Sequence, residues 1–142
     1  MVTAQPTFRR LRLRDAFTRA TTPTLVGWRL VGPAGAVADR LRAADTPARR
    51  LRGLLGRPPL EAGEAFVIRP CSQVHTIGMR YPIDAVFCDR NLRVLDVQRL
   101  ATGRMSRMVR RAWCCIELPS GTAESCAIEP GVELRLEAPD VR

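Results

Sequence analysis

Several side chains that could do chemistry lie in the stretch from Cys71 to Phe87, CSQVHTIGMRYPIDAVF. It contains Cys71, the single histidine His75, Arg80 and Asp84, with apolar residues between them. A thiol and an imidazole separated by three residues could share a metal ion, or the imidazole could activate the thiol as a nucleophile. A metal would need further protein ligands, and the chain has no second histidine. We therefore predict no metal and no cofactor.

Two carboxylates are expected to need partners. Asp84 and Glu117 each lie within an apolar run, and burying an unpaired charge is costly. Arg80 could serve both acids, because a guanidinium offers five donors in a planar fork. We expect Arg80 and Asp84 to form a partly buried pair that orders the bend at Tyr81-Pro82. The candidate ligand-binding residues are His75, Thr76, Arg80, Asp84 and Glu117, and the candidate nucleophile is Cys71.

Short apolar segments separated by turn residues must position these side chains. This pattern predicts a mainly β (α+β) fold, a small barrel or sandwich of short, mostly antiparallel strands with one or two short helices. Strands are expected over residues 25–31, 36–43, 65–69, 74–79, 83–88, 92–100, 113–118 and 132–137. Asp45-Thr46-Pro47 is typical of a helix start, and Gly56 of its end. A single helical turn is expected from Thr122 to Cys126.

The N-terminal segment differs from the rest of the chain. Five arginines lie within residues 1–22, against a single acid, Asp15. We predict a basic, flexible tail over 1–22 and one mainly-β domain over 23–142. The alternative is a basic amphipathic segment that docks on a membrane surface, a nucleic acid or an acidic partner.

Composition limits the classes of function. The net charge is +9, but all the basic residues are arginine and none is lysine, which indicates a coding bias more than a nucleic-acid site. Non-specific, salt-dependent attraction of polyanions is still expected. The five cysteines are odd in number and form no C-x-x-C pair, which favours free thiols and a cytoplasmic location. No apolar run is long enough to span a bilayer.

Three segments carry a family resemblance: RLRGLLGRPPL, GEAFVIRPCSQVHTIGMRYPIDAVFCDRNLRV and IELPSGTAESCAIEPGVELRL. The run HT-x-GMR-x-PID-x-x-F is fairly specific. Over about residues 37 to 137 the chain resembles the family called domain of unknown function 192, a group of prokaryotic proteins. The resemblance implies a compact, mainly β domain with one or two short helices, and it implies no activity, substrate or cofactor. Many relatives carry a secretion signal, whereas this chain resembles the cytoplasmic members.

Three function classes follow. The favoured hypothesis is a non-enzymatic module that binds a small polar ligand or a protein partner through a polar site around His75 and Asp84. The first alternative is a small enzyme that uses His75 with Cys71 or a carboxylate. The second is a weak binder of nucleic acid or anionic surfaces through the N-terminal arginines and the 104–111 loop.

Overall fold

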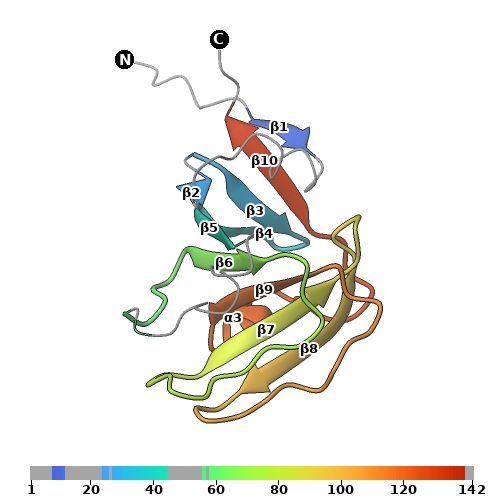
Figure 1. Ribbon diagram of the computed structural model, residues 1–142. Helices are drawn as coiled ribbons and strands as arrows, with labels where there is room; N and C mark the ends of the chain where they lie inside the picture. The colour runs from blue at the N-terminus through green and yellow to red at the C-terminus, as the bar shows by residue number, and fades with distance from the viewer. Residues whose placement is uncertain (1–7, 12–23, 26, 45–55, 57, 140–142) are drawn as a thin grey trace.

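The protein folds into two β-sheets and one short helix (Figure 1). In a computed structural model, the described residues are 8–11, 24–25, 27–44, 56 and 58–139. The strands of both sheets are short, and all neighbouring pairs but one are antiparallel. The expected mainly-β class is confirmed, and the described strands form two open sheets, not a closed barrel.

The smaller sheet has four strands in the order β1-β10-β3-β4. Its members are β1 (Phe8–Leu11), β10 (Arg135–Pro139), β3 (Arg29–Gly32) and β4 (Gly35–Ala38). Strand β1 lies within the segment expected to be a tail, and it pairs with β10 from Phe8↔Pro139 to Leu11↔Leu136. The Arg29 guanidinium also lies 3.7 Å from the centroid of the Phe8 ring. Part of the N-terminal segment is therefore an edge strand.

The larger sheet has six strands in the order β2-β5-β6-β9-β7-β8. Its members are β2 (Thr24–Leu25), β5 (Arg40–Ala44), β6 (Glu64–Ile68), β9 (Cys114–Pro119), β7 (Ile83–Cys88) and β8 (Val94–Leu100). The pair β5–β6 is parallel. The central strands β7 and β9 are buried along almost their whole length, so their sequences do not alternate between apolar and polar residues.

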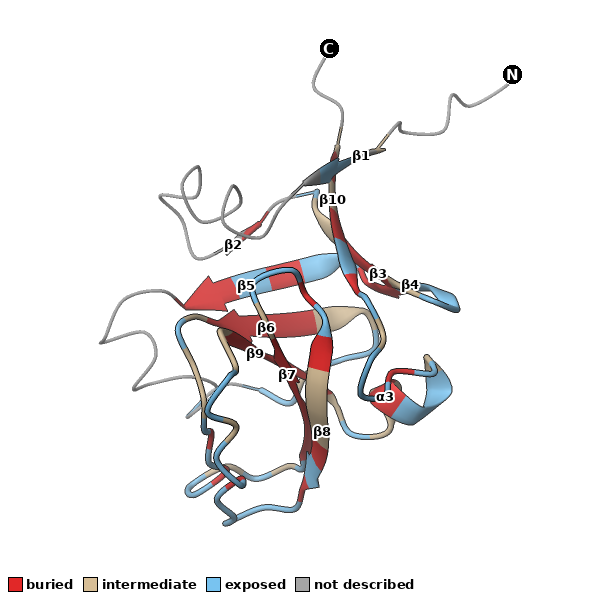
Figure 2. Ribbon diagram, turned by 90° about the vertical axis from the view of Figure 1, so that its right-hand side faces the viewer, coloured by how far each residue is buried: buried red, intermediate tan, exposed pale blue. Residues whose placement is uncertain are grey.

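The larger sheet is covered on both faces (Figure 2). One apolar core joins it to the smaller sheet and to the helix α3 (Thr122–Ser125), and includes Leu30, Leu136 and Leu118. The second core lies on the opposite face, and is built from β6, β7 and β9 together with the long connections that follow β6 and β8. Cys114 and Cys115 are consecutive residues of β9 and belong to different cores, because successive side chains of a strand point to opposite faces of the sheet.

Most expected strands lie close to their observed positions. Three expectations need correction. The expected strand 25–31 is broken, with only 24–25 and 29–32 extended, and the expected strand 36–43 is divided between β4 and β5. The expected strand 74–79 is irregular and makes only an isolated bridge between His75 and Met105. The expected helix over 45–56 falls almost wholly outside the described residues.

The short helix is the only helix among the described residues. Its four residues are far fewer than a membrane crossing requires, and no described helix is long and apolar enough for one.

Candidate functional site

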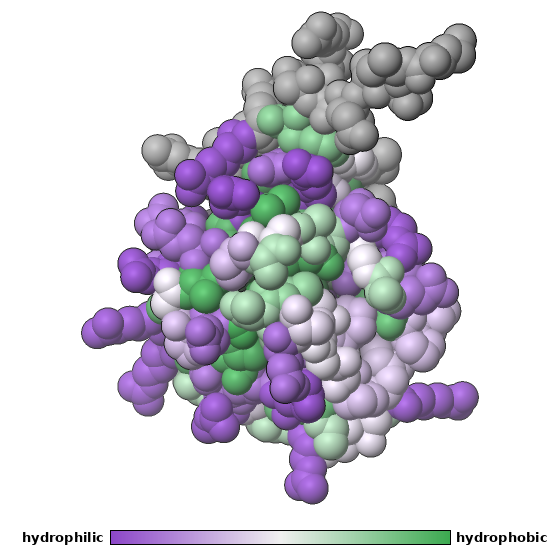
Figure 3. All heavy atoms as spheres, turned by 180° about the vertical axis from the view of Figure 1, so that it is seen from behind, coloured by the Kyte–Doolittle hydropathy of each residue, from purple (hydrophilic) through white to green (hydrophobic). Residues whose placement is uncertain are grey.

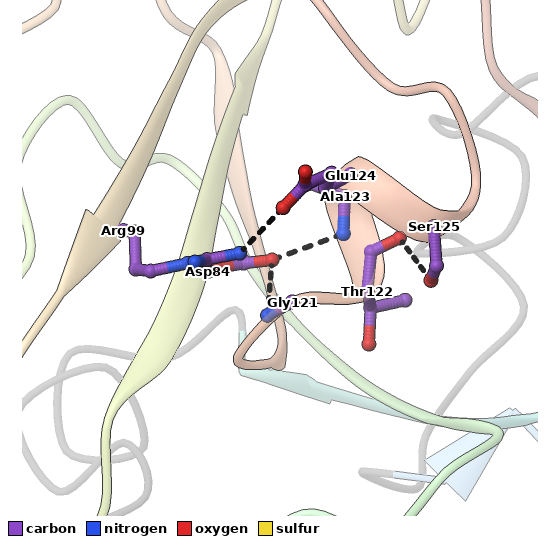
Figure 4. Close-up of polar contacts among 7 residues, drawn as sticks. All are labelled: Asp84, Arg99, Gly121, Thr122, Ala123, Glu124 and Ser125. Atoms are coloured by element: carbon purple, nitrogen blue, oxygen red, sulfur yellow. Dashed lines mark hydrogen bonds and ion pairs between the residues drawn. The ribbon is translucent and has the colours of Figure 1, made fainter.

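Asp84 anchors the short helix to the larger sheet (Figure 4). Its side chain is only 2% exposed, and Oδ2 accepts hydrogen bonds from the backbone N–H groups of Gly121 and Ala123, each at 2.9 Å. These N–H groups lie at the start of α3, where the backbone donors have no partner within the helix. The N-cap residue is Gly121, which has no side chain to accept these bonds. The carboxylate of Asp84, which lies far from the helix in the sequence, accepts these hydrogen bonds instead.

The ion-pair partner of Asp84 is Arg99, not Arg80. Strands β7 and β8 place Asp84 directly opposite Arg99, and Arg99 Nε lies 3.4 Å from Asp84 Oδ1. Arg99 also lies 3.4 Å from Glu124 of α3, so the guanidinium spans both acids. Arg80 is exposed and makes no ion pair among the described residues. The predicted Arg80–Asp84 pair is therefore wrong, because the partner comes from the adjacent strand and not from the bend.

Glu117 lies on the opposite face of the sheet from Asp84. In the pairing of β7 with β9, Glu117 is opposite Ala85, while Asp84 is opposite Leu118. Residues directly opposite each other share a face, and successive residues alternate. Glu117 therefore points to the second core with Ala85, and Asp84 points to α3. The five expected ligand-binding residues do not converge on one pocket.

The Glu117 carboxyl is enclosed by apolar groups. It is 3% exposed, and Phe66 of β6 and Ala85 of β7 flank it in the sheet. Burial, with a smaller contribution from the neighbouring Cys71, raises the pKa of Glu117 to about 8. Its Oε2 has no hydrogen-bond partner among the described residues. A carboxyl in this setting holds its proton at neutral pH, because the charged form is poorly solvated.

Cys71 and Cys115 lie beside this carboxyl. Burial, together with a hydrogen bond to Cys71 and the nearby Glu117, raises the pKa of the Cys115 thiol well above its ordinary value. Cys71 is half-buried, and its Sγ lies 3.3 Å from the carbonyl oxygen of Gln73. All five cysteines are free thiols. Within the described part of the chain, no three His, Cys, Asp or Glu side chains are grouped to hold a metal ion.

The two long connections on this face pair with each other. We call residues 69–82, between β6 and β7, and residues 101–113, between β8 and β9, the paired loops. Backbone hydrogen bonds join them along their length: Cys71 N to Trp113 O (3.3 Å), Val109 N to Ser72 O (2.8 Å), Ser106 N to Val74 O (2.8 Å) and Thr76 N to Arg104 O (2.7 Å). The irregular segment expected to be a strand is therefore held by a second irregular segment.

Thr76 is the main polar tie between the paired loops. It is fully buried, and its hydroxyl donates to Ala101 O at 2.6 Å and accepts from Arg104 N at 2.9 Å. Gln98 of β8 holds the second of the paired loops to the sheet: its amide oxygen accepts from Arg107 N at 2.8 Å, and its amide nitrogen donates to Arg107 O at 3.2 Å. The expected ligand role of Thr76 remains a prediction, and its observed contacts are structural. His75, in contrast, is exposed beside Met105.

The paired loops carry every large apolar side chain that is strongly exposed in the described part of the chain. Ile77 is 54% exposed, Met105 61% and Met108 56%. The strand expected over 74–79 does not form, so Ile77 is not buried against a sheet. The sequence does contain one indication of exposed methionines: in the run 104–111, two methionines lie three residues apart among arginines.

The paired loops are also strongly basic. They contain six arginines and neither an aspartate nor a glutamate. Of these, Arg107 pairs with Asp96 of β8 at 3.4 Å, whereas no carboxylate in the described residues lies within ion-pair distance of Arg80, Arg104, Arg110 or Arg111. Some arginines elsewhere, such as Arg29 and Arg40, are paired with acids. On the face shown in Figure 3, hydrophilic side chains lie mainly around the edge, and hydrophobic ones lie toward the middle.

The fold and the site define a small two-sheet β domain with paired loops on one face. The chain matches the model of domain of unknown function 192, described as an uncharacterised ACR, over residues 31–136. It therefore belongs to this family, as the HT-x-GMR-x-PID-x-x-F run predicted.

Relatives and solved structures agree with this assignment. A UPF0127 protein of Pyrococcus horikoshii is 33% identical over 99 residues, covering 67% of this chain and 85% of that protein. A UPF0127 protein of Thermococcus sibiricus is 29% identical over 107 residues, covering 72% and 70%. A protein of unknown function from Novosphingobium aromaticivorans has a similar crystal structure, with a TM-score of 0.67, 19% identity and 92% of each chain covered. The last similarity concerns the fold alone.

Proposed function

We propose that this protein is a non-enzymatic binding module that holds an acidic segment of a partner protein on its paired loops. The observation that carries the proposal is the position of Ile77, Met105 and Met108. All three are more than half exposed, and all three lie on the paired loops. Exposed apolar side chains that gather on one surface mark an interaction site, whereas scattered ones need no explanation.

The positive charge of the paired loops favours an acidic partner. Four arginines without a nearby carboxylate lie on the same loops as the apolar side chains, and no acid within the loops opposes them. Arginine binds carboxylates through two parallel hydrogen bonds, and it is enriched at protein interfaces. A partner segment that alternates acidic and apolar residues would satisfy both features.

The hydrogen bonds between the loops support a rigid binding surface. The side-chain hydrogen bonds of Thr76 and Gln73 add to the backbone bonds that join the two loops. Loops ordered before binding lose less conformational entropy when a partner arrives. The two methionines can still adjust, since their side chains are unbranched and flexible.

The alternative of nucleic-acid binding is less well supported. Single-stranded nucleic acids are held by aromatic side chains on which the bases stack. The strongly exposed apolar residues here are an isoleucine and two methionines. These aliphatic side chains suit the apolar groups of a protein.

A small enzyme remains the second candidate, and the observation that favours it is the Glu117 carboxyl beside the half-buried Cys71. A carboxyl with a raised pKa is a frequent feature of catalytic sites. His75, the other expected participant, is exposed on the paired loops.

We also propose a cytoplasmic location, in line with five cysteines that are all free.

Fluorescence anisotropy with a short labelled peptide that alternates Glu and Leu tests the proposal. The protein should bind this peptide more tightly than an all-Glu peptide of equal length, because only the first can cover the apolar side chains. Duplex DNA and vesicles of anionic lipid serve as further probes. Equal binding of the two peptides, or tighter binding of DNA or vesicles, would reject the acidic-apolar partner.

A further inference from the structure

A separate, shallow cavity that is largely open to solvent lies beside the turn that joins β7 to β8. Its volume is about 380 Å³, within the range of about 300–1,000 Å³ usual for small-molecule sites. The lining residues come from the turn and from the end of the second paired loop: Asp89, Arg90, Asn91, Arg111, Ala112 and Trp113. None of the exposed apolar residues that carry the proposed protein-binding surface lines this cavity.

The cavity offers more free donors than acceptors. Neither Arg90 nor Arg111 has a carboxylate within ion-pair distance in the described part of the chain. The one acid in the lining, Asp89, already accepts hydrogen bonds through Oδ1 from Asn91 N (2.8 Å) and Arg93 N (3.0 Å). These bonds hold the turn in place, and two arginines against one carboxylate leave the lining with a net positive charge.

Trp113 supplies an apolar wall. It is partly buried and packs against the core between the sheets. The Arg69 guanidinium lies 4.9 Å from the centroid of the Trp113 ring. The backbone C=O of Trp113 accepts a hydrogen bond from Cys71 N, and its N–H donates one to Cys88 O. The backbone of Trp113 is therefore held at both its N–H and its C=O, and its ring packs against Arg69 and the core, which suits the residue to receive an apolar group without rearrangement.

We propose that this cavity binds a small organic anion. The carboxylate or phosphate of such a ligand would contact Arg90 and Arg111, the Asn91 amide would add a hydrogen bond, and the apolar part would contact Trp113. Charge-assisted hydrogen bonds from guanidinium groups are among the stronger polar contacts in proteins. Two arginines with one wall of aromatic surface therefore favour an anion that carries a ring or an alkyl group over a bare inorganic ion.

Tryptophan fluorescence gives a direct test, because the chain has only two tryptophans and one of them lines the cavity. In a Trp28→Phe variant the signal reports Trp113 alone, and calorimetry on the parent protein repeats the titration without any substitution. The probes are benzoate, phenyl phosphate, inorganic phosphate and benzyl alcohol. We expect saturable binding of benzoate or phenyl phosphate, with inorganic phosphate and benzyl alcohol bound at least about tenfold more weakly.

Two variants complete the test. Arg111→Gln should weaken binding of the aromatic anion by about tenfold or more, since a charge-assisted contact is lost. Arg42→Gln on β5 is the matched control and should bind like the parent. No saturable binding in either assay, equal binding of benzyl alcohol, or equal affinity of the Arg111→Gln variant would each overturn the proposal. These small probes leave the peptide assay untouched, so the two proposals fail separately.

Discussion

Asp84 and Glu117 lie on opposite faces of the six-stranded sheet, although both are buried carboxyl groups on neighbouring strands. Asp84 accepts hydrogen bonds from the start of α3 and faces Arg99. Glu117 lies in an apolar core, and burial raises its pKa to about 8. One acid is therefore held as a charged structural anchor, and the other is held in its neutral form. Their substitution should have different consequences.

The first prediction concerns the anchor. Asp84→Asn should destabilise the domain by about 2–3 kcal/mol, because two backbone N–H groups lose a charged acceptor and Arg99 loses its partner. Arg80→Ala is the control and should stay within about 0.5 kcal/mol of the parent, since Arg80 is exposed and has no ion pair in the described residues. Urea denaturation of the three proteins measures both values. Equal loss in the two variants would mean that Arg80 supports Asp84 after all.

The second prediction concerns pH. The pKa of Glu117 is about 8 in the folded protein, against an ordinary value of 4.5. The folded state therefore binds the proton more tightly than the unfolded chain, and stability should fall as pH rises from about 4.5 to about 8. Above that range both states are ionised, and the full cost of the buried charge is present, on the order of a few kcal/mol.

Glu117→Gln should remove this dependence. The neutral amide has nearly the same shape, so the variant should be more stable than the parent at about pH 9 and should lose that advantage at about pH 5. Glu133→Gln, an exposed acid on the connection before β10, is the control. Urea denaturation at several pH values compares the three. A parent whose stability is unchanged across this range would show that Glu117 is ionised and paired.

The third prediction concerns the paired loops. Thr76→Val keeps the side-chain volume but removes the hydroxyl that bonds Ala101 O and Arg104 N. We expect a loss of about 1–3 kcal/mol, because these backbone groups lose their partner. Amide hydrogen exchange should accelerate at Gly103 and Arg104 more than at β7. Thr102→Val, at an exposed neighbour, should leave the exchange pattern unchanged.

The fourth prediction concerns the N-terminal strand. Sequence alone predicts that residues 1–22 add little stability, but Phe8–Leu11 pairs with β10 and Phe8 contacts Arg29. Phe8→Ala should therefore cost about 0.5–1 kcal/mol from the lost cation–π contact, plus the lost apolar contact. Deletion of residues 1–11 should lower the melting temperature by several degrees. A deletion variant that melts with the parent would restore the interpretation as a tail.

Local signals in the sequence predicted much of the fold. Asp89-Arg90-Asn91, between the expected strands 83–88 and 92–100, forms a turn in which Asp89 Oδ1 accepts hydrogen bonds from the backbone N–H groups of Asn91 and Arg93. The strands 83–88, 92–100 and 113–118 agree with β7, β8 and β9 to within about two residues, the usual uncertainty of such boundaries. Each of these elements is indicated by the pattern of its own residues.

The errors concern contacts between residues far apart in the chain. The sequence offers Arg80, four residues away, as the partner of Asp84, and it gives no distance to Arg99, Gly121 or Ala123. The segment 74–79 alternates like a strand, yet its backbone partners lie in the irregular segment 101–113. The exposure of Ile77 follows from this pairing and has no local signal.

Peptide binding by a variant of the paired loops tests the central claim most directly. In the double variant Met105→Ser, Met108→Ser, both apolar side chains are replaced on residues that are already exposed, so the fold should be retained. The dissociation constant for the Glu-Leu peptide, measured by anisotropy, should rise at least about tenfold, and Arg104→Gln should raise it as well. Arg42→Gln, which removes an equal charge from β5, should leave it unchanged. If the double variant binds like the parent, or if Arg42→Gln weakens binding as much as Arg104→Gln, the paired loops are not the binding surface.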